Sequence, residues 1–199
     1  MKKILTAGLI GAMCVCGLGV ASVQAADKPQ QTVTVLNLGA IDEAGVKNLE
    51  AYLASNLPLP VRVVTAGKEN ELDDAMEAVT KARTATDAIL IALVPLKDLK
   101  SITLVDADHA LALVNTEALA REAKSPIRVN LAVLRALAGT LGVGNSYDPH
   151  CVYRRMAAAA EYDKLGGNFS PPTLQQVLIA AGERGVKTTL VTRKQPAKK

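Results

Sequence analysis

The sequence is poor in aromatic residues and in histidine. Its 199 residues include one Phe, no Trp and two His, and aromatic side chains make up only 3% of the chain. Proteins that bind single-stranded nucleic acid use aromatic rings on which the bases stack. A formal net charge of +4 is also a weak electrostatic footprint for DNA or RNA. We therefore expect no nucleic-acid partner.

The N-terminus has the pattern of a secretory signal peptide. Two lysines precede an apolar run over residues 4–20, and the small residues Val23 and Ala25 frame a cleavage site. The run is close to the minimum length for a membrane span, but the polar chain that follows favours cleavage after Ala25. Residues 1–25 are therefore predicted to direct export to the periplasm or the exterior. The mature protein is expected to keep no stable membrane anchor.

Cysteine becomes scarcer still after this cleavage, because Cys14 and Cys16 are removed and Cys151 remains as the single thiol. One thiol cannot form an internal disulfide, although an exported compartment would permit one. At the other end, residues 193–199 are rich in Lys and Arg and are predicted to form a disordered, solvated tail. The stretch between them, residues 26–192, has the length of a single domain.

Hydrophobic periodicity within this domain predicts strands that alternate with helices. Strands are expected over 32–38, 61–65, 87–94, 102–105 and 110–115. Helices are expected over 42–57, 70–82, a short segment capped by Thr116, and 129–141. The apolar run 87–94 is typical of a central strand covered on both faces, whereas 102–105 and 110–115 are expected to be a hairpin or edge strands. The order predicts an α/β fold with a mixed sheet packed against helices.

Two of the expected helices carry an apolar stripe at helical spacing. Between residues 42 and 57 the stripe consists of Val46, Leu49, Leu53 and Leu57. Between residues 70 and 82 it consists of Leu72, Met76, Val79 and Ala82. These side chains are expected to face the core.

The segment 135–146 has the frame of a zinc-protease helix without the residues that such a site needs. A zinc peptidase of this kind uses two histidines one helical turn apart, so that both imidazoles point at one ion. It also needs a glutamate as general base and a third ligand after the turn. Here the helix positions are Arg135 and Gly139, the base position is Ala136, and the third ligand position is Asn145. We therefore predict no catalytic residues, no bound metal and no other cofactor.

The spacing of this segment resembles the archaemetzincin family, which carries HExxHxxGxxHC, then four residues, Cys-x-Met, and later a Cys-x-x-Cys pair. Gly142 and Cys151 match the family, whereas Ser146 and Tyr153 stand in place of Cys and Met. Farther on, Asn168-Phe169-Ser170-Pro171-Pro172-Thr173 resembles the family's Phe-Cys-Pro-x-Cys ending with both cysteines replaced. The resemblance implies a metzincin-type fold, with the long helix packed under the sheet, in a degenerate member that lacks the zinc-binding and catalytic residues.

Five polar or aromatic residues are candidates for the lining of the former active-site cleft: Arg135, Asn145, Tyr147, Asp148 and Tyr153. Arg135 is the only charge within 129–143, so its guanidinium must reach water or an acid such as Asp148. If Arg135 instead lines the cleft, it offers a fixed positive charge suited to a carboxylate. Asn145 lies in a stretch with the composition of a turn, and Gly142 and Gly144 suit tight-turn geometry.

Three interpretations of His150 and Cys151 stay open. A nucleophilic Cys/His pair requires the imidazole beside the thiol, and adjacent residues rarely face one another in that way. Metal binding by Asp148, His150 and Cys151, with His109, would need the segment around His109 to approach this loop. The third interpretation is a small buried thiol next to a surface histidine.

The sequence as a whole favours binding over catalysis, because no second constellation of ionisable residues points to a reaction. We expect an exported, catalytically inactive archaemetzincin-like protein that binds an unidentified peptide or protein partner in the former cleft. The alternative is an enzyme, hydrolase-like or peptidase-like, with non-zinc or relocated-metal chemistry. Such an enzyme would use Tyr147, Asp148, Tyr153 or Arg135 in the same cleft. A structural or interaction domain without a functional pocket is a third interpretation.

Overall fold

A five-stranded mixed sheet runs through the protein in a computed structural model that describes residues 29–122, 127–156 and 159–188. The strands lie in the order β2-β1-β3-β5-β4, with β4 antiparallel to β5 and the other neighbours parallel. Their bounds are β1 Thr32–Asn37, β2 Val61–Thr65, β3 Asp87–Val94, β4 Thr103–Asp106 and β5 Leu111–Asn115. The predicted signal peptide (1–25) and tail (193–199) lie outside the described residues.

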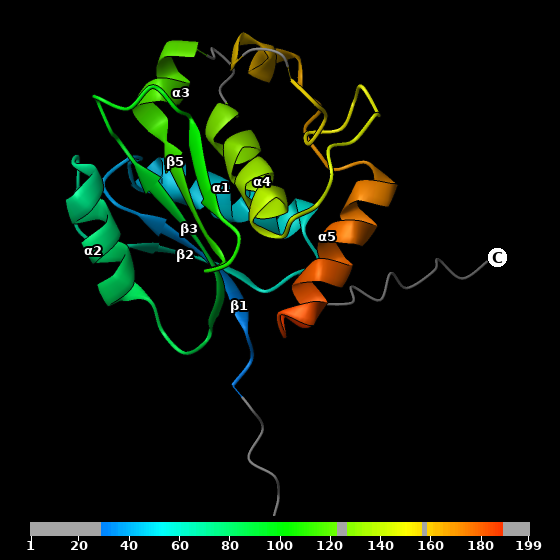
Figure 1. Ribbon diagram of the computed structural model, residues 1–199, viewed down its shortest axis with the longest axis horizontal. Coiled ribbons are helices and arrows are strands. Elements are labelled where there is room, and N and C mark those ends of the chain that lie inside the picture. Colours follow the sequence, from blue (N-terminus) through cyan, green and yellow to red (C-terminus); the bar gives the residue numbers. More distant parts are fainter. Residues whose placement is uncertain (1–28, 123–126, 157–158, 189–199) are drawn as a thin grey trace, which may run out of the picture.

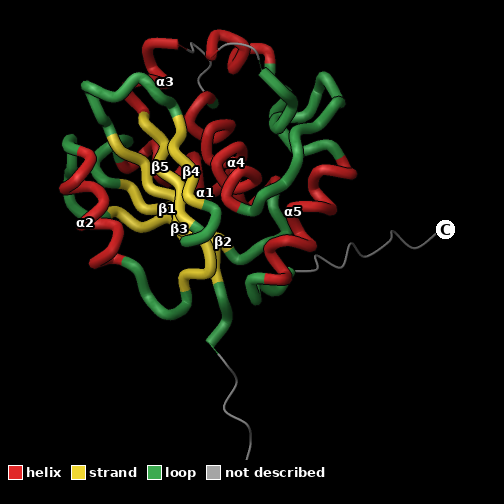
Figure 2. The backbone as a smooth tube through the Cα atoms, viewed as in Figure 1, coloured by secondary structure: helices red, strands yellow, loops and turns green. Residues whose placement is uncertain are grey.

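Helices cover both faces of this sheet (Figures 1 and 2). The described elements are α1 Glu43–Asn56, α2 Leu72–Ala82, α3 Thr116–Glu122, α4 Arg128–Thr140, the 3₁₀ helix η1 Ala159–Lys164, and α5 Pro171–Glu183. The α2 helix packs on one face, and α1 and α4 pack on the other. The predicted α/β fold with a mixed sheet is confirmed. No helix in the described part of the chain combines the length and the apolarity that crossing a membrane requires.

The central strand β3 is buried on both faces, as its apolar run predicts. Its side chains alternate between the two cores because successive residues of a strand point to opposite sides. Ile89, Ile91 and Leu93 pack with α1 and α4. Leu90, Ala92 and Val94 pack with α2.

The long apolar helix α4 is buried on nearly every side. Of its 13 residues, nine are buried, and Arg135 is the charged side chain in its middle. The chain leaves the helix through Gly142, which has a φ of +68°, and the Val143 amide donates to the Ala138 carbonyl. A left-handed residue at this place closes the helix end, as expected for glycine.

The predicted stripe on α2 is wrong in part. Ala75 and Val79 are the buried residues of this helix, whereas Leu72 and Met76 are 38% and 37% exposed. The small Ala75 side chain is fully buried and lies one turn before Val79, so the helix contacts the sheet along an alanine-rich line. The larger Leu72 and Met76 side chains lie beside that line. By contrast, Leu49, Leu53 and Leu57 of the predicted α1 stripe are buried.

The α5 helix was not predicted, since no helix was expected after residue 141. It begins after Ser170 with two prolines in its first turn, positions where a missing N–H costs little. Its buried residues Thr173, Val177 and Ala181 recur every fourth position. A short bridge between Cys151 and Asn168 joins the start of α5 to the loop that follows α4.

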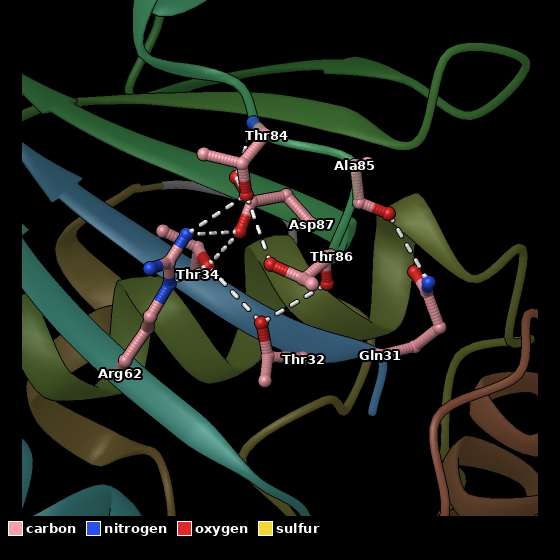
Figure 3. Close-up of polar contacts among 8 residues, drawn as sticks. All are labelled: Gln31, Thr32, Thr34, Arg62, Thr84, Ala85, Thr86 and Asp87. Atoms are coloured by element: carbon pink, nitrogen blue, oxygen red, sulfur yellow. Dashed lines mark hydrogen bonds and ion pairs between the residues drawn. The ribbon is translucent and has the colours of Figure 1, made fainter. Parts of the chain in front are cut away.

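A buried carboxylate organises the amino ends of the parallel strands (Figure 3). The Asp87 side chain is fully buried and accepts hydrogen bonds from Thr34 Oγ1 at 2.5 Å, Arg62 Nη2 at 2.6 Å and the Thr84 amide at 2.7 Å. Burial opposes ionisation of Asp87, but these hydrogen bonds outweigh it and lower the pKa of the carboxyl group. The network joins β1, β2 and β3 at the edge opposite to their carboxyl ends.

Candidate functional site

Arg135 donates its hydrogen bonds to backbone carbonyls. Its Nη1 lies 2.7 Å from the carbonyl oxygen of Val152 and 3.0 Å from that of Arg154. The sequence left water or an acid such as Asp148 open as the partner of Arg135. Among the described residues Arg135 makes no ion pair with Asp148, and backbone carbonyls take that place. The reason is local: the loop after α4 folds back over the helix, where Ser146 bridges to Arg154, and brings its carbonyls to the guanidinium.

Two tyrosine rings complete the surroundings of this guanidinium. The guanidinium carbon of Arg135 lies 5.3 Å from the ring centroid of Tyr153 and 5.7 Å from that of Tyr162. Burial raises the pKa of both phenols, and the nearby Arg135 charge opposes that rise. Cation–π contacts of this kind contribute about 0.5–2 kcal/mol each. Arg135 is therefore held as a structural cation in the middle of α4.

Gly139 faces the edge strand and Tyr153. A Cβ atom on Gly139 would lie 3.3 Å from Val105 Cγ2 and 3.6 Å from the Tyr153 hydroxyl oxygen. A larger side chain at this position would have to displace both neighbours. Ala136, one turn earlier, is fully buried, so a side chain there would point into the core and not into a cleft.

The structure brings together four residues that the resemblance aligns with cysteines of the family: Ser146, Cys151, Ser170 and Thr173. The hydroxyl oxygens of Ser146 and Ser170 lie 3.3 Å apart, and those of Ser170 and Thr173 lie 2.9 Å apart. The Cys151 thiol donates to Thr173 Oγ1 at 3.6 Å and accepts from the Ser170 amide at 3.2 Å. These contacts hold the loop after α4 against the first turn of α5.

The Cys151 thiol is fully buried in this cluster. Burial alone would raise its pKa, but hydrogen bonds from the amides of Ser170 and Tyr153 outweigh that effect and lower the pKa. The Cys151 thiol is therefore shielded from solvent and accepts several hydrogen bonds from the residues around it.

A pocket of about 350 Å³ opens beside this cluster. Its lining residues come from the loop after α4 and the first turns of α5: Gly144, Asn145, Ser146, Tyr147, Asp148, Ser170, Pro172, Thr173 and Gln176. The Tyr147 side chain is fully exposed, and the Asp148 amide donates to Ser146 Oγ at 3.2 Å. Three of the five candidate cleft residues, Asn145, Tyr147 and Asp148, therefore share one pocket, whereas Arg135 and Tyr153 do not line it.

Solved structures with a similar fold include an archaemetzincin from Methanopyrus kandleri, with a TM-score of 0.58 and 15% sequence identity over 79% of this chain and 99% of that one. A zinc-dependent peptidase from Methanocorpusculum labreanum has a TM-score of 0.55 and 13% identity over 72% of this chain and 99% of its own. This is an archaemetzincin-like fold. The sequence matches no protein-family model and no curated protein.

The residues that this archaemetzincin-like fold presents at the end of α4 do not fit a zinc ion. Arg135 is a cation that only donates hydrogen bonds, and Gly139 has no ligand atom. Asn145 is exposed at the rim of the pocket and supplies a neutral amide. No step of a reaction can therefore be assigned to a metal held by these positions.

The structure also places the remaining candidates of the archaemetzincin-like domain. Cys151 points to Ser170 and Thr173, while His150 is exposed and its backbone amide donates to Asp148. The His109 ring bonds to Asp106 at 2.7 Å in the turn between β4 and β5. Within 29–122, 127–156 and 159–188, no group of three or more His, Cys, Asp or Glu is placed to hold a metal ion.

Sequence reasoning missed Tyr162 and Gln176. Tyr162 lies in η1 and reaches Arg135 across a long stretch of sequence, so no local pattern could have paired them. Gln176 was identifiable in principle. Thr173, Val177 and Ala181 are spaced four residues apart, which is typical of the buried face of a helix, and Gln176 then falls on the exposed face.

Proposed function

We propose that this protein is an exported, non-catalytic relative of archaemetzincins that binds a peptide or protein partner in the pocket formed by the loop after α4 and the start of α5. The observation that carries the proposal is the pocket itself, which gathers Asn145, Tyr147 and Asp148. Exposed tyrosine is enriched at protein-binding surfaces, and the rim around such contacts is polar.

The loss of catalysis is supported by what stands at the family's zinc and base positions. Arg135 is committed to two carbonyls and two aromatic rings. Gly139 has Val105 and Tyr153 where an imidazole would need space. Without a Lewis acid or a general base at these positions, no residue there can activate a water molecule.

A peptide is the favoured ligand class because β4 forms an edge of the sheet. Among the described strands, β4 pairs with β5 alone, so its other edge offers backbone groups to an extended chain. Val105 in this strand is 45% exposed and contacts Gly139 near the end of α4. An extended peptide can add to such an edge as a further strand.

Export completes the proposal and rests on the sequence of residues 1–25. A fusion of residues 1–26 to a reporter enzyme is expected to cross the inner membrane, and the mature protein is expected to begin near Ala26. An intact N-terminus on membrane-embedded protein would contradict this part of the proposal and leave the pocket argument unaffected.

The binding proposal is tested by selecting peptides from a displayed library against purified mature protein. We expect Tyr147→Ala and Asp148→Asn each to weaken the selected peptides by about tenfold or more, as loss of a central contact does. Ile179→Ala, an exposed residue of α5 outside the pocket, is the matched control. Peptides that bind wild type and both pocket variants equally would refute the assigned pocket.

The same peptides also test the enzymatic alternative. Mass spectrometry after prolonged incubation is expected to show them intact, with or without added zinc. Chelator-insensitive cleavage that Tyr147→Ala or Asp148→Asn abolishes would instead establish an enzyme of different chemistry in the same pocket.

A further inference from the structure

A second pocket, of about 460 Å³, lies at the carboxyl ends of the parallel strands. It is formed by loops that follow β1, β2 and β3 and by the first turns of α3 and α4. Its described lining residues are Gly39, Ala40, Ile41, Lys68, Asn70, Pro95, Lys97, Thr116, Glu117, Ala120, Arg128 and Val129. None of them belongs to the candidate site, so this pocket is a separate feature of the molecule.

The topology of the sheet places this pocket between strands whose connections diverge. The neighbours β1 and β3 run parallel. After β1 the chain returns through α1 to β2 on one side, and after β3 it continues to β4 and β5 on the other side. In open α/β sheets, small molecules bind preferentially in the crevice at such a divergence, outside the carboxyl ends of the strands.

One wall of the pocket is held by a buried asparagine at the end of β1. Asn37 is 1% exposed, and its Oδ1 accepts from the amides of Ala40 at 3.0 Å and Ile41 at 3.1 Å. Its Nδ2 donates to the Ile41 carbonyl at 2.8 Å. The loop that carries Gly39, Ala40 and Ile41 is therefore fixed from inside the protein.

The opposite wall is held in the same way by the last residue of β5. Asn115 is 2% exposed, and its Oδ1 accepts from the Leu96 amide at 3.0 Å, while its Nδ2 donates to the Leu99 carbonyl at 2.8 Å. The same Oδ1 accepts from the Glu117 amide at 3.2 Å, so Asn115, and not Thr116 as expected, caps α3. Because both walls are already ordered, less conformational entropy is lost when a ligand binds.

The charges around the pocket are mainly positive. Its described lining includes three cations, Lys68, Lys97 and Arg128, and one carboxylate, Glu117. Gly39 has a φ of +76°, and a Cβ there would lie 2.5 Å from Lys68 Cγ. Glycine thus lets the aliphatic stem of Lys68, a residue of the pocket lining, lie directly on the first loop.

We propose that this pocket binds a small organic phosphate. Lys68 and Lys97 alone outnumber Glu117, the carboxylate of the described lining, and this positive balance suits an oxyanion group. Ammonium and guanidinium groups are the usual donors to phosphate oxygens. Asn70 and Thr116 add neutral polar groups for the rest of the molecule, and the volume exceeds what an inorganic ion alone would fill.

The test uses the mature protein with glycerol 3-phosphate and inorganic phosphate as probes, at constant ionic strength and with succinate as a dicarboxylate comparison. Calorimetric titration and thermal unfolding are expected to show saturable binding of the phosphate monoester and a rise in Tm. The double variant Lys68→Gln/Lys97→Gln should weaken binding by about tenfold or more. Lys187→Gln, an exposed lysine outside the lining, should bind like wild type.

Several outcomes would overturn the proposal. One is the absence of a phosphate-dependent shift in wild type, and another is an equal response of wild type, double variant and control. Binding of succinate without binding of the phosphate monoester would refute the assigned ligand class. Tyr147→Ala is expected to keep full phosphate binding, which separates this pocket from the peptide site.

Discussion

The guanidinium of Arg135 lies over the ring of Tyr153, with 5.3 Å between the guanidinium carbon and the ring centroid. The resemblance aligns these two residues with the first histidine of the HExxH segment and with the methionine of the Cys-x-Met segment. In this chain they bind each other. The end of α4 is therefore stabilised by contacts within the protein and has no need of an ion to connect helix and loop.

Arg135→Ala is expected to lower the free energy of unfolding by about 2–3 kcal/mol, because two partly buried carbonyls lose a charged donor. Urea unfolding followed by circular dichroism measures the change. Arg155→Ala is the control, since the Arg155 side chain is exposed and such substitutions change stability by about 0.5 kcal/mol or less. Equal effects of the two substitutions would show that the contacts of Arg135 contribute little.

The cluster around Cys151 is expected to accept zinc once its hydroxyls become thiols. With a Zn–S bond of about 2.3 Å, tetrahedral ligands lie about 3.8 Å apart, and the present contacts span 2.9–3.6 Å. The variant Ser146→Cys/Ser170→Cys/Thr173→Cys should therefore bind one zinc per chain. Its Tm should rise with zinc and fall with a chelator. A folded triple variant that remains free of zinc would argue against the alignment of these four positions.

Rebuilding the zinc site that the resemblance places at residues 135, 139 and 145 is expected to need more than the three histidine ligands. The variant Arg135→His/Gly139→His/Asn145→His should bind little zinc, because Val105 and Tyr153 adjoin Gly139. Adding Val105→Ala and Tyr153→Met should make room and raise zinc toward one per chain, measured by elemental analysis after dialysis. Equal zinc contents with and without the added changes would show that these two neighbours do not obstruct the site.

Asp87 is expected to make the fold sensitive to acid. Its pKa is lowered in the folded state, so its contribution to stability is complete above its ordinary pKa of about 4 and is lost as pH falls toward the folded-state value. Asp87→Asn should cost about 1–3 kcal/mol at neutral pH and flatten the acid limb of stability against pH. The exposed Asp98→Asn is the control. An unchanged acid limb in Asp87→Asn would assign acid sensitivity to other groups.

Much of the fold could be predicted because its strands are short and strongly apolar. The apolar run Asp87–Val94 predicts a strand buried on both faces. Asparagine, proline and glycine residues between the apolar runs indicate most ends of the helices and strands. The burial of α2 could not be predicted as well. Periodicity alone favours the large Leu72 and Met76 side chains, whereas the small Ala75 decides which face approaches the sheet.

The candidate site was harder to predict than the fold because its contacts join distant segments. The loss of the zinc ligands follows directly from the residues at 135, 139 and 145. The partners of Arg135 do not, since carbonyl groups carry no sequence signal and Tyr162 is far along the chain. Likewise, Asn37 and Asn115 look like ordinary turn residues, and only the structure shows that each holds a wall of a pocket.

Because Cys151 is buried, the rate at which its thiol is labelled reports local opening of the fold. Its thiol is sealed between the loop after α4 and the first turn of α5 and is the free cysteine of the described chain. A thiol reagent can therefore react only when these two segments separate, and the labelling rate reports the free energy of that separation. Ligands that hold the loop against α5 would lower the labelling rate, and ligands that separate the loop from α5 would raise it.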